Sequence, residues 1–168
     1  MRETLFKEFA LVGLPRPPEA LVSISRVEPE GEEELSFTRD GWQYDEADRT
    51  REMSWLHRVC VQITIALHRD WGTWVGEIAY GLHLSLRQAL DYVDTEVVVL
   101  PTVIRQNPPQ KAYWHVRGTR RVGVSKADVQ MVCCGVREAS RFCGLELDRI
   151  PSVDVVDSEF GPNWSPNM

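Results

Sequence analysis

The chain has 168 residues, a net charge of −6, 43% hydrophobic residues and 26% charged residues. This composition is that of a soluble globular domain and excludes collagen-like, low-complexity and disordered chains. No apolar run approaches the length of a membrane span, and charges occupy the N-terminal positions where a signal peptide needs an apolar core. We therefore expect a cytoplasmic protein with no membrane contact. The four cysteines lack the spacing of a disulfide framework, so we expect reduced thiols.

The charges are strongly segregated along the chain. Residues 1–50 hold six basic and twelve acidic side chains, whereas residues 97–127 hold six basic side chains and no acid. Segregation of this kind bears on the partners of a protein and not on its fold.

The N-terminal fifty residues predict a short helix followed by a small sheet. Residues 2–12 favour a helix, and the prolines of 13–20 favour extended backbone after it. The alternation of apolar and polar residues in 21–45 predicts antiparallel strands, with Asp40-Gly41 as a hairpin turn.

Three helices are expected next. Residues 46–72 place apolar side chains at helical spacing, and Thr73 is a suitable N-cap for a second helix over 74–82. Ser85 and Gln88 form a capping-box pattern that predicts a third helix over 86–94.

The C-terminal part predicts a hairpin, a helix and a tail. Residues 96–118 are β-branched and apolar around the turn-forming "NPPQ", which favours a β-hairpin. Ser125 and Asp128 predict a capped helix over 125–143, which Gly144 ends. The acidic residues after it predict an extended tail.

The segment "GTWVGEIAYGLHLSLRQALDYV" followed by "EVVVLPTVIRQNPPQKAYWHVRG" resembles a winged helix-turn-helix domain over residues 52–118. The resemblance implies an α+β fold with a winged-helix core at 49–124. An acidic β-rich extension at 1–48 and a C-terminal helix with an acidic tail at 125–168 would flank it.

In the winged-helix family, the helix that matches 86–94 enters the major groove and the hairpin contacts the DNA backbone. The resemblance therefore implies that Arg87, Gln88 and Tyr92 face the bases. Asp91 and Asp94 depart from this pattern, because carboxylates are repelled by phosphates. The alternative is that 86–94 is a packing helix with a solvated acidic edge.

The hairpin and the loop after it form the stronger signal for nucleic acid. Cations interleaved with aromatic side chains suit contacts with phosphates and stacking on bases. The alternative is a solvated basic face that balances the acidic sheet. The candidate contacts here are Arg105, Lys111, Tyr113, Arg117, Arg120, Arg121 and Lys126.

The acidic segment 28–48 has three interpretations: a solvated surface, a cover over the basic wing, or a mimic of nucleic acid. As contacts for a protein partner we select four acidic residues and two aromatic anchors in the tail. They are Glu30, Glu32, Glu33, Glu34, Phe160 and Trp164.

No metal, cofactor or catalytic site is expected. His57, Cys60, Cys133 and Cys134 lack zinc-ligand spacing and fall on apolar helix faces, where cysteine behaves as a small hydrophobe. Nothing in the sequence places a histidine beside an exposed cysteine, as a thiol nucleophile would need.

Two functional hypotheses follow. The first is a non-enzymatic regulator or accessory factor that binds double-stranded DNA mainly through a basic wing, as a homodimer. The second is a protein-interaction module that uses acidic surfaces on the same scaffold, for example a phage- or plasmid-encoded inhibitor of a nucleic-acid-handling complex.

Overall fold

The computed structural model describes residues 2–29, 31, 43, 45–50, 74–84 and 89–160, and within these ranges it is helical and contains no strand. Residues 46–50 form a helical segment. The named elements are the π-helix η1 (Trp74–Leu84) and the α-helices α1 (Arg2–Val12), α2 (Arg16–Ser25), α6 (Tyr92–Arg105), α7 (Pro109–Arg121), α8 (Lys126–Phe142) and α9 (Val153–Ser158).

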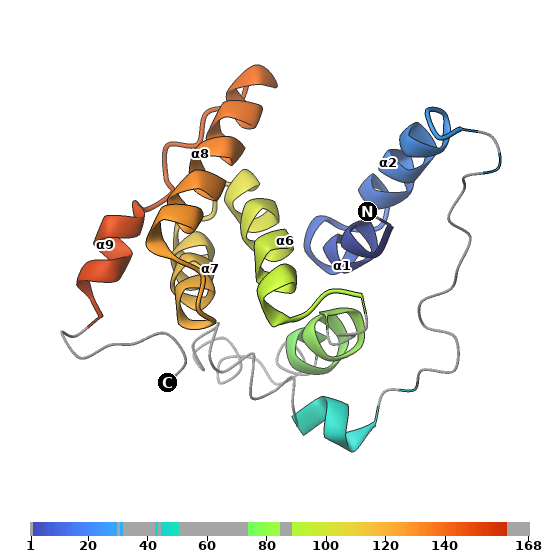
Figure 1. Cartoon of the computed structure of the whole chain (residues 1–168), viewed down its shortest axis with the longest axis horizontal. Coiled ribbons are helices and arrows are strands. Elements are labelled where there is room, and N and C mark those ends of the chain that lie inside the picture. The colour runs from blue at the N-terminus through green and yellow to red at the C-terminus, as the bar shows by residue number, and fades with distance from the viewer. Residues whose placement is uncertain are drawn as a thin grey trace.

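Helix α6 stands at the centre of the molecule, between α1 on one side and the pair α7 and α8 on the other (Figure 1). Two pairs of its residues, each one turn apart, are buried on adjacent faces. Val99 and Val103 pack with η1, whereas Leu100 and Ile104 pack with residues of α7, α8 and α9. Because its two apolar faces point to different neighbours, α6 joins the two core clusters of the molecule.

The predicted β-hairpin at 96–118 is wrong, because these residues belong to α6 and α7. β-branched residues have only a weak preference for strands, and burial of α6 on adjacent faces outweighs it. The turn between the helices contains Asn107 at a φ of 58°, in the left-handed region. Pro109 then occupies the first position of α7, where the absence of an amide proton costs nothing.

The predicted N-terminal sheet is also wrong where the structure describes it. Residues 21–25 belong to α2, which begins at Arg16 and carries prolines in its first turn. The prolines of 13–20 therefore start a helix instead of extending the chain. The second predicted strand lies almost wholly outside the described residues. The α+β fold class is overturned by these two corrections.

The predicted reading helix at 86–94 is wrong at its C-terminal end, because α6 begins at Tyr92 and residues 89–91 are not helical. The Asp91 carboxylate accepts a hydrogen bond from the Asp94 N–H at 2.9 Å, and the Asp94 carboxylate accepts one from the Asp91 N–H at 3.3 Å. The two acids that conflicted with DNA binding thus form the capping box of α6. Residues 85–88 lie outside the described residues.

Three predicted helices are confirmed. Residues 2–12 form α1, and the predicted 74–82 lies within η1. The predicted helix 125–143 is α8, which is one residue shorter at each end. The Ser125 side chain accepts a hydrogen bond from the Asp128 N–H at its start, and Gly144 follows its end at a φ of 73°.

The remaining segments are partly described. Of the predicted helix 46–72, residues 46–50 are helical and the rest lie outside the described residues. The predicted extended tail contains α9, and residues 161–168 again lie outside. None of the helices described here is long and apolar enough to span a membrane.

The central role of α6 predicts a steep cost for removing its buried side chains. Leu100→Ala deletes a fully buried side chain, so the free energy of unfolding should fall by about 2–5 kcal/mol. Val97→Ala changes an exposed residue of the same helix and should cost under about 1 kcal/mol. Urea denaturation followed by circular dichroism measures both, and equal losses would contradict the packing described.

Candidate functional site

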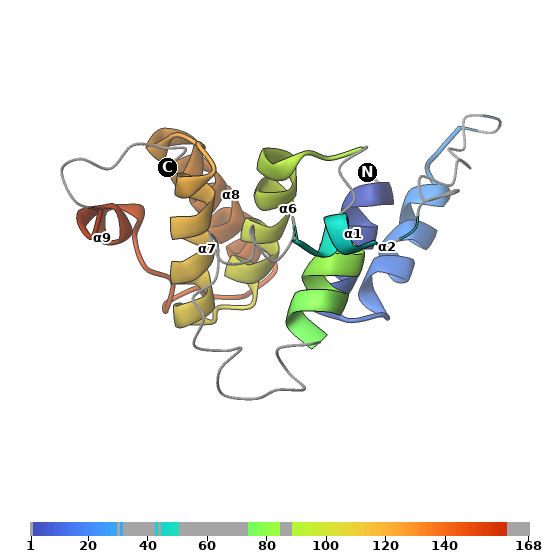
Figure 2. The ribbon, with the colours of Figure 1, turned by 90° about the horizontal axis from the view of Figure 1, so that it is seen from below.

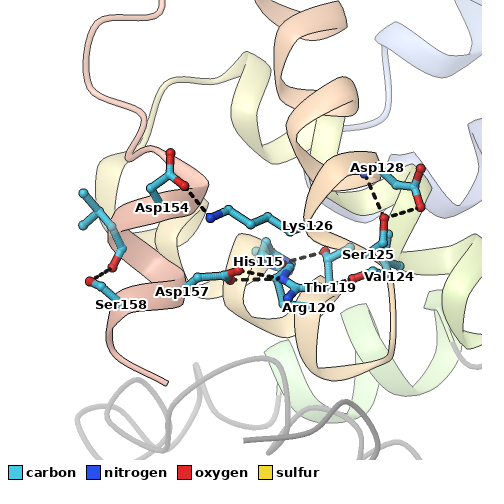
Figure 3. Close-up of polar contacts among 11 residues, drawn as sticks. His115, Thr119, Arg120, Val124, Ser125, Lys126, Asp128, Asp154, Asp157 and Ser158 are labelled. Carbon is cyan, nitrogen blue, oxygen red and sulfur yellow. Dashed lines mark hydrogen bonds and ion pairs between the residues drawn. The ribbon is translucent and has the colours of Figure 1, made fainter. Parts of the chain in front are cut away.

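Helix α9 is held against α7 by a largely buried ion pair (Figure 3). Arg120 Nε donates to both carboxylate oxygens of Asp157, at 3.0 and 3.2 Å. Arg120 Nη1 also donates to the Val124 carbonyl oxygen at 2.5 Å. Since Arg120 is only 9% exposed, this predicted DNA contact is instead an internal structural residue.

Two further predicted DNA contacts face acids of the same region. Lys126 Nζ lies 2.5 Å from Asp154 Oδ1, and this hydrogen bond raises the pKa of Lys126 (Figure 3). Tyr113 Oη donates to the Glu159 carboxylate, and burial together with this bond raises the pKa of Tyr113. The acids of α9 and the residue after it therefore occupy part of the predicted basic surface.

The other predicted DNA contacts are distributed along α6 and α7. Arg105 is exposed at the end of α6, and Lys111 Nζ lies 4.1 Å from the centre of the Trp114 ring. Arg117 and Arg121 are half-buried on α7, where burial and the nearby charge of Arg117 lower the pKa of Arg121.

Tyr92 is half-buried and packs beside the cluster of η1 and α6 residues. Arg87 and Gln88 lie outside the described residues. Phe160 is half-buried against the core, which makes it a packing residue within this chain.

The remaining partner contacts, Glu30, Glu32, Glu33, Glu34 and Trp164, lie outside the described residues, as do His57 and Cys60. Cys133 is buried in the core, and burial raises the pKa of its thiol. Cys134 is exposed on the same helix. The thiol of Cys133 is thus a core group.

A buried polar cluster joins η1, α6 and α7. His115 Nε2 lies 3.3 Å from Tyr80 Oη, and His115 Nδ1 lies 3.7 Å from Glu96 Oε2. Thr119 Oγ1 lies 3.3 Å from the same carboxylate oxygen. Glu96 is fully buried and His115 nearly so, so these groups lie in the interior between the three helices. The cluster fixes how the three helices pack.

An apolar groove lies between α1 and η1, which run side by side (Figure 2). It has a volume of about 390 Å³. Trp74 and Leu14 stand at its edge with 53% and 64% of their surfaces exposed. The lining residues are Phe9, Ala10, Gly13, Leu14, Trp74, Val75, Ala79 and His83.

The groove is held in shape by contacts beneath it. The His83 ring packs against Phe6 and Phe9 of α1, with ring centroids 5.4 and 4.9 Å apart. The ammonium group of Lys7, a fully buried side chain, donates to the Leu84 carbonyl oxygen at 2.8 Å. Because the last carbonyl groups of a helix lack partners within it, this bond satisfies the end of η1.

Sequence reasoning missed the groove. Nothing local in the sequence shows that α1 packs on a helix some seventy residues later. The feature of the sequence that could have indicated the groove is the pair of aromatic residues in α1, Phe6 and Phe9, followed by the apolar Leu14.

Comparison with known proteins finds no matching family model, curated protein or solved structure. Within the part of the chain that the structure describes, the groove is a candidate binding site on geometric grounds.

The two ion pairs of α9 should differ in their contribution to stability. Asp157→Ala leaves the buried guanidinium of Arg120 without its carboxylate, so the free energy of unfolding should fall by about 2 kcal/mol. Asp154→Ala removes the exposed pair with Lys126 and should cost much less, because solvent screens an exposed ion pair. Urea titrations of both variants test this, and an equal effect would contradict the assigned burial.

Proposed function

We propose that this protein is a non-enzymatic protein-interaction module whose groove between α1 and η1 binds an apolar segment of a partner. The observation that carries the proposal is the open apolar groove with Trp74 and Leu14 exposed at its edge. Exposed apolar patches with aromatic residues mark interaction sites, because their burial releases water from apolar surface.

The dimensions of the groove favour a helix as its occupant. Helix α1 has 11 residues and is thus about 16 Å long, so a partner helix of three turns would match it. Grooves between two helices bind amphipathic helices through apolar side chains one turn apart.

Charge favours a basic partner. Residues 1–14, which contain the α1 side of the groove, hold two basic and two acidic side chains, whereas the chain as a whole carries a net charge of −6. A basic partner is therefore attracted by the protein as a whole and not by the groove itself. A segment with apolar residues on one face and lysine or arginine on the other would gain both burial and electrostatic attraction.

DNA binding, the first hypothesis from the sequence, stays a prediction with less support. Arg120 and Lys126 already pair with Asp157 and Asp154. Cations engaged by internal carboxylates release fewer counterions on binding phosphates, which lowers the affinity they can supply.

Selection of basic amphipathic peptides on the full-length protein tests the proposal. The peptides have about four helical turns, one more than the match requires, because shorter helices are marginal in isolation. Bound peptides are titrated by fluorescence anisotropy. Leu14→Asp places a carboxylate in the groove and should weaken binding about tenfold or more. Val22→Asp adds the same charge at an exposed position on α2 that does not line the groove, and it should change the affinity less than about twofold.

Equal effects of the two variants would reject the groove as the site. Absence of any selected peptide, together with salt-dependent binding of random duplex DNA, would instead favour the DNA hypothesis.

A further inference from the structure

The outer face of α8 exposes apolar and small side chains along its whole length. Met131 and Phe142 have 69% and 94% of their surfaces exposed. Figure 1 shows the C-terminal end of α8 projecting beyond α6 and α7. The other exposed residues of this face are Ala127, Cys134, Gly135 and Glu138, which follow helical spacing.

Gly135 is the residue of this face that the fold itself does not explain. A Cβ atom built there would meet no other atom within 4 Å. Glycine inside a helix is less stable than alanine, and here it provides no space that this chain uses. Together with Cys134, it makes the middle of the 17-residue helix narrow, and helices approach closely at such small residues.

We propose that α8 is the contact between two copies of this chain, which cross in antiparallel orientation at Cys134 and Gly135. A two-fold axis at the middle of the helix places the small residues of both copies against each other. The larger Met131 and Phe142 then flank the crossing and lose their exposure to water. Both copies use the same residues, as an isologous contact requires.

Charge favours a second copy over an unrelated charged partner. The chain carries a net charge of −6 and therefore repels its own copies in general. The α8 face is an exception, because Glu138 pairs with Arg141 at 2.5 Å and the other face residues are uncharged. Two copies can meet there without bringing like charges together.

The expected dimer is weak. A helix of 17 residues is about 25 Å long, and a single crossing of two such helices lies at the small end of specific interfaces. The mass by light scattering should therefore rise with concentration from 19.3 kDa toward twice that value.

Gly135→Lys tests the crossing point, because lysine is favoured over glycine in a helix and meets open space in the single chain. The variant should keep its helical circular dichroism and remain at the mass of one chain at every concentration. Phe142→Glu is a second variant with the same expected result. Ala47→Lys is an exposed change in the helical segment 46–50, which Figure 1 shows away from α8, and it should leave dimer formation unchanged.

Thiol cross-linking gives an independent readout. Cys134 lies beside the proposed two-fold axis, so the oxidant diamide should join two chains through it. Cys143→Ser should leave the cross-link intact, since Cys143 follows the C-terminal end of α8 and lies away from the crossing at its middle, whereas Cys134→Ser should abolish it. Three results would each overturn the proposal. The first is a mass of one chain at every protein concentration up to about 300 μM. The others are a Gly135→Lys variant that forms as much dimer as the unaltered chain, and a cross-link that survives Cys134→Ser.

Discussion

Burial of α6 on two adjacent faces is the constraint on which the described structure depends. Val99 and Val103 contact the cluster with η1, and Leu100 and Ile104 contact the cluster with α7, α8 and α9. The Asp91–Asp94 capping box fixes where the helix begins, and Asn107 turns the chain directly after it. With α6 fixed in this way, α1 is placed on one side of it and α7 and α8 on the other.

Helices with strong local signals could be predicted from the sequence. Ser125, Asp128 and Gly144 define α8 almost to the residue because caps are local hydrogen-bond patterns. Helix α6 could not be predicted, since a helix buried on adjacent faces and a buried strand both give a continuous apolar run. "EVVVLPTVIR" is such a run, and only its tertiary contacts decide that it is helical.

The candidate site was missed for a related reason. The groove needs Phe9 and Leu14 from one end of the chain beside Trp74 and Ala79 from its middle. No spacing rule connects residues so distant in sequence. The basic residues of α7 were visible in the sequence, but their pairing was not. Asp157 satisfies Arg120 through a tertiary contact between α7 and α9, so a cation count overestimates the charge available to phosphates.

The account of function rests on the groove between α1 and η1, and hydrogen–deuterium exchange of the full-length protein tests it most directly. With a selected basic amphipathic peptide bound, the amides of α1 and η1 should exchange more slowly, while those of α7 should be unchanged. Slower exchange confined to α7, with α1 and η1 unaffected, would contradict the assignment of the groove as the binding site.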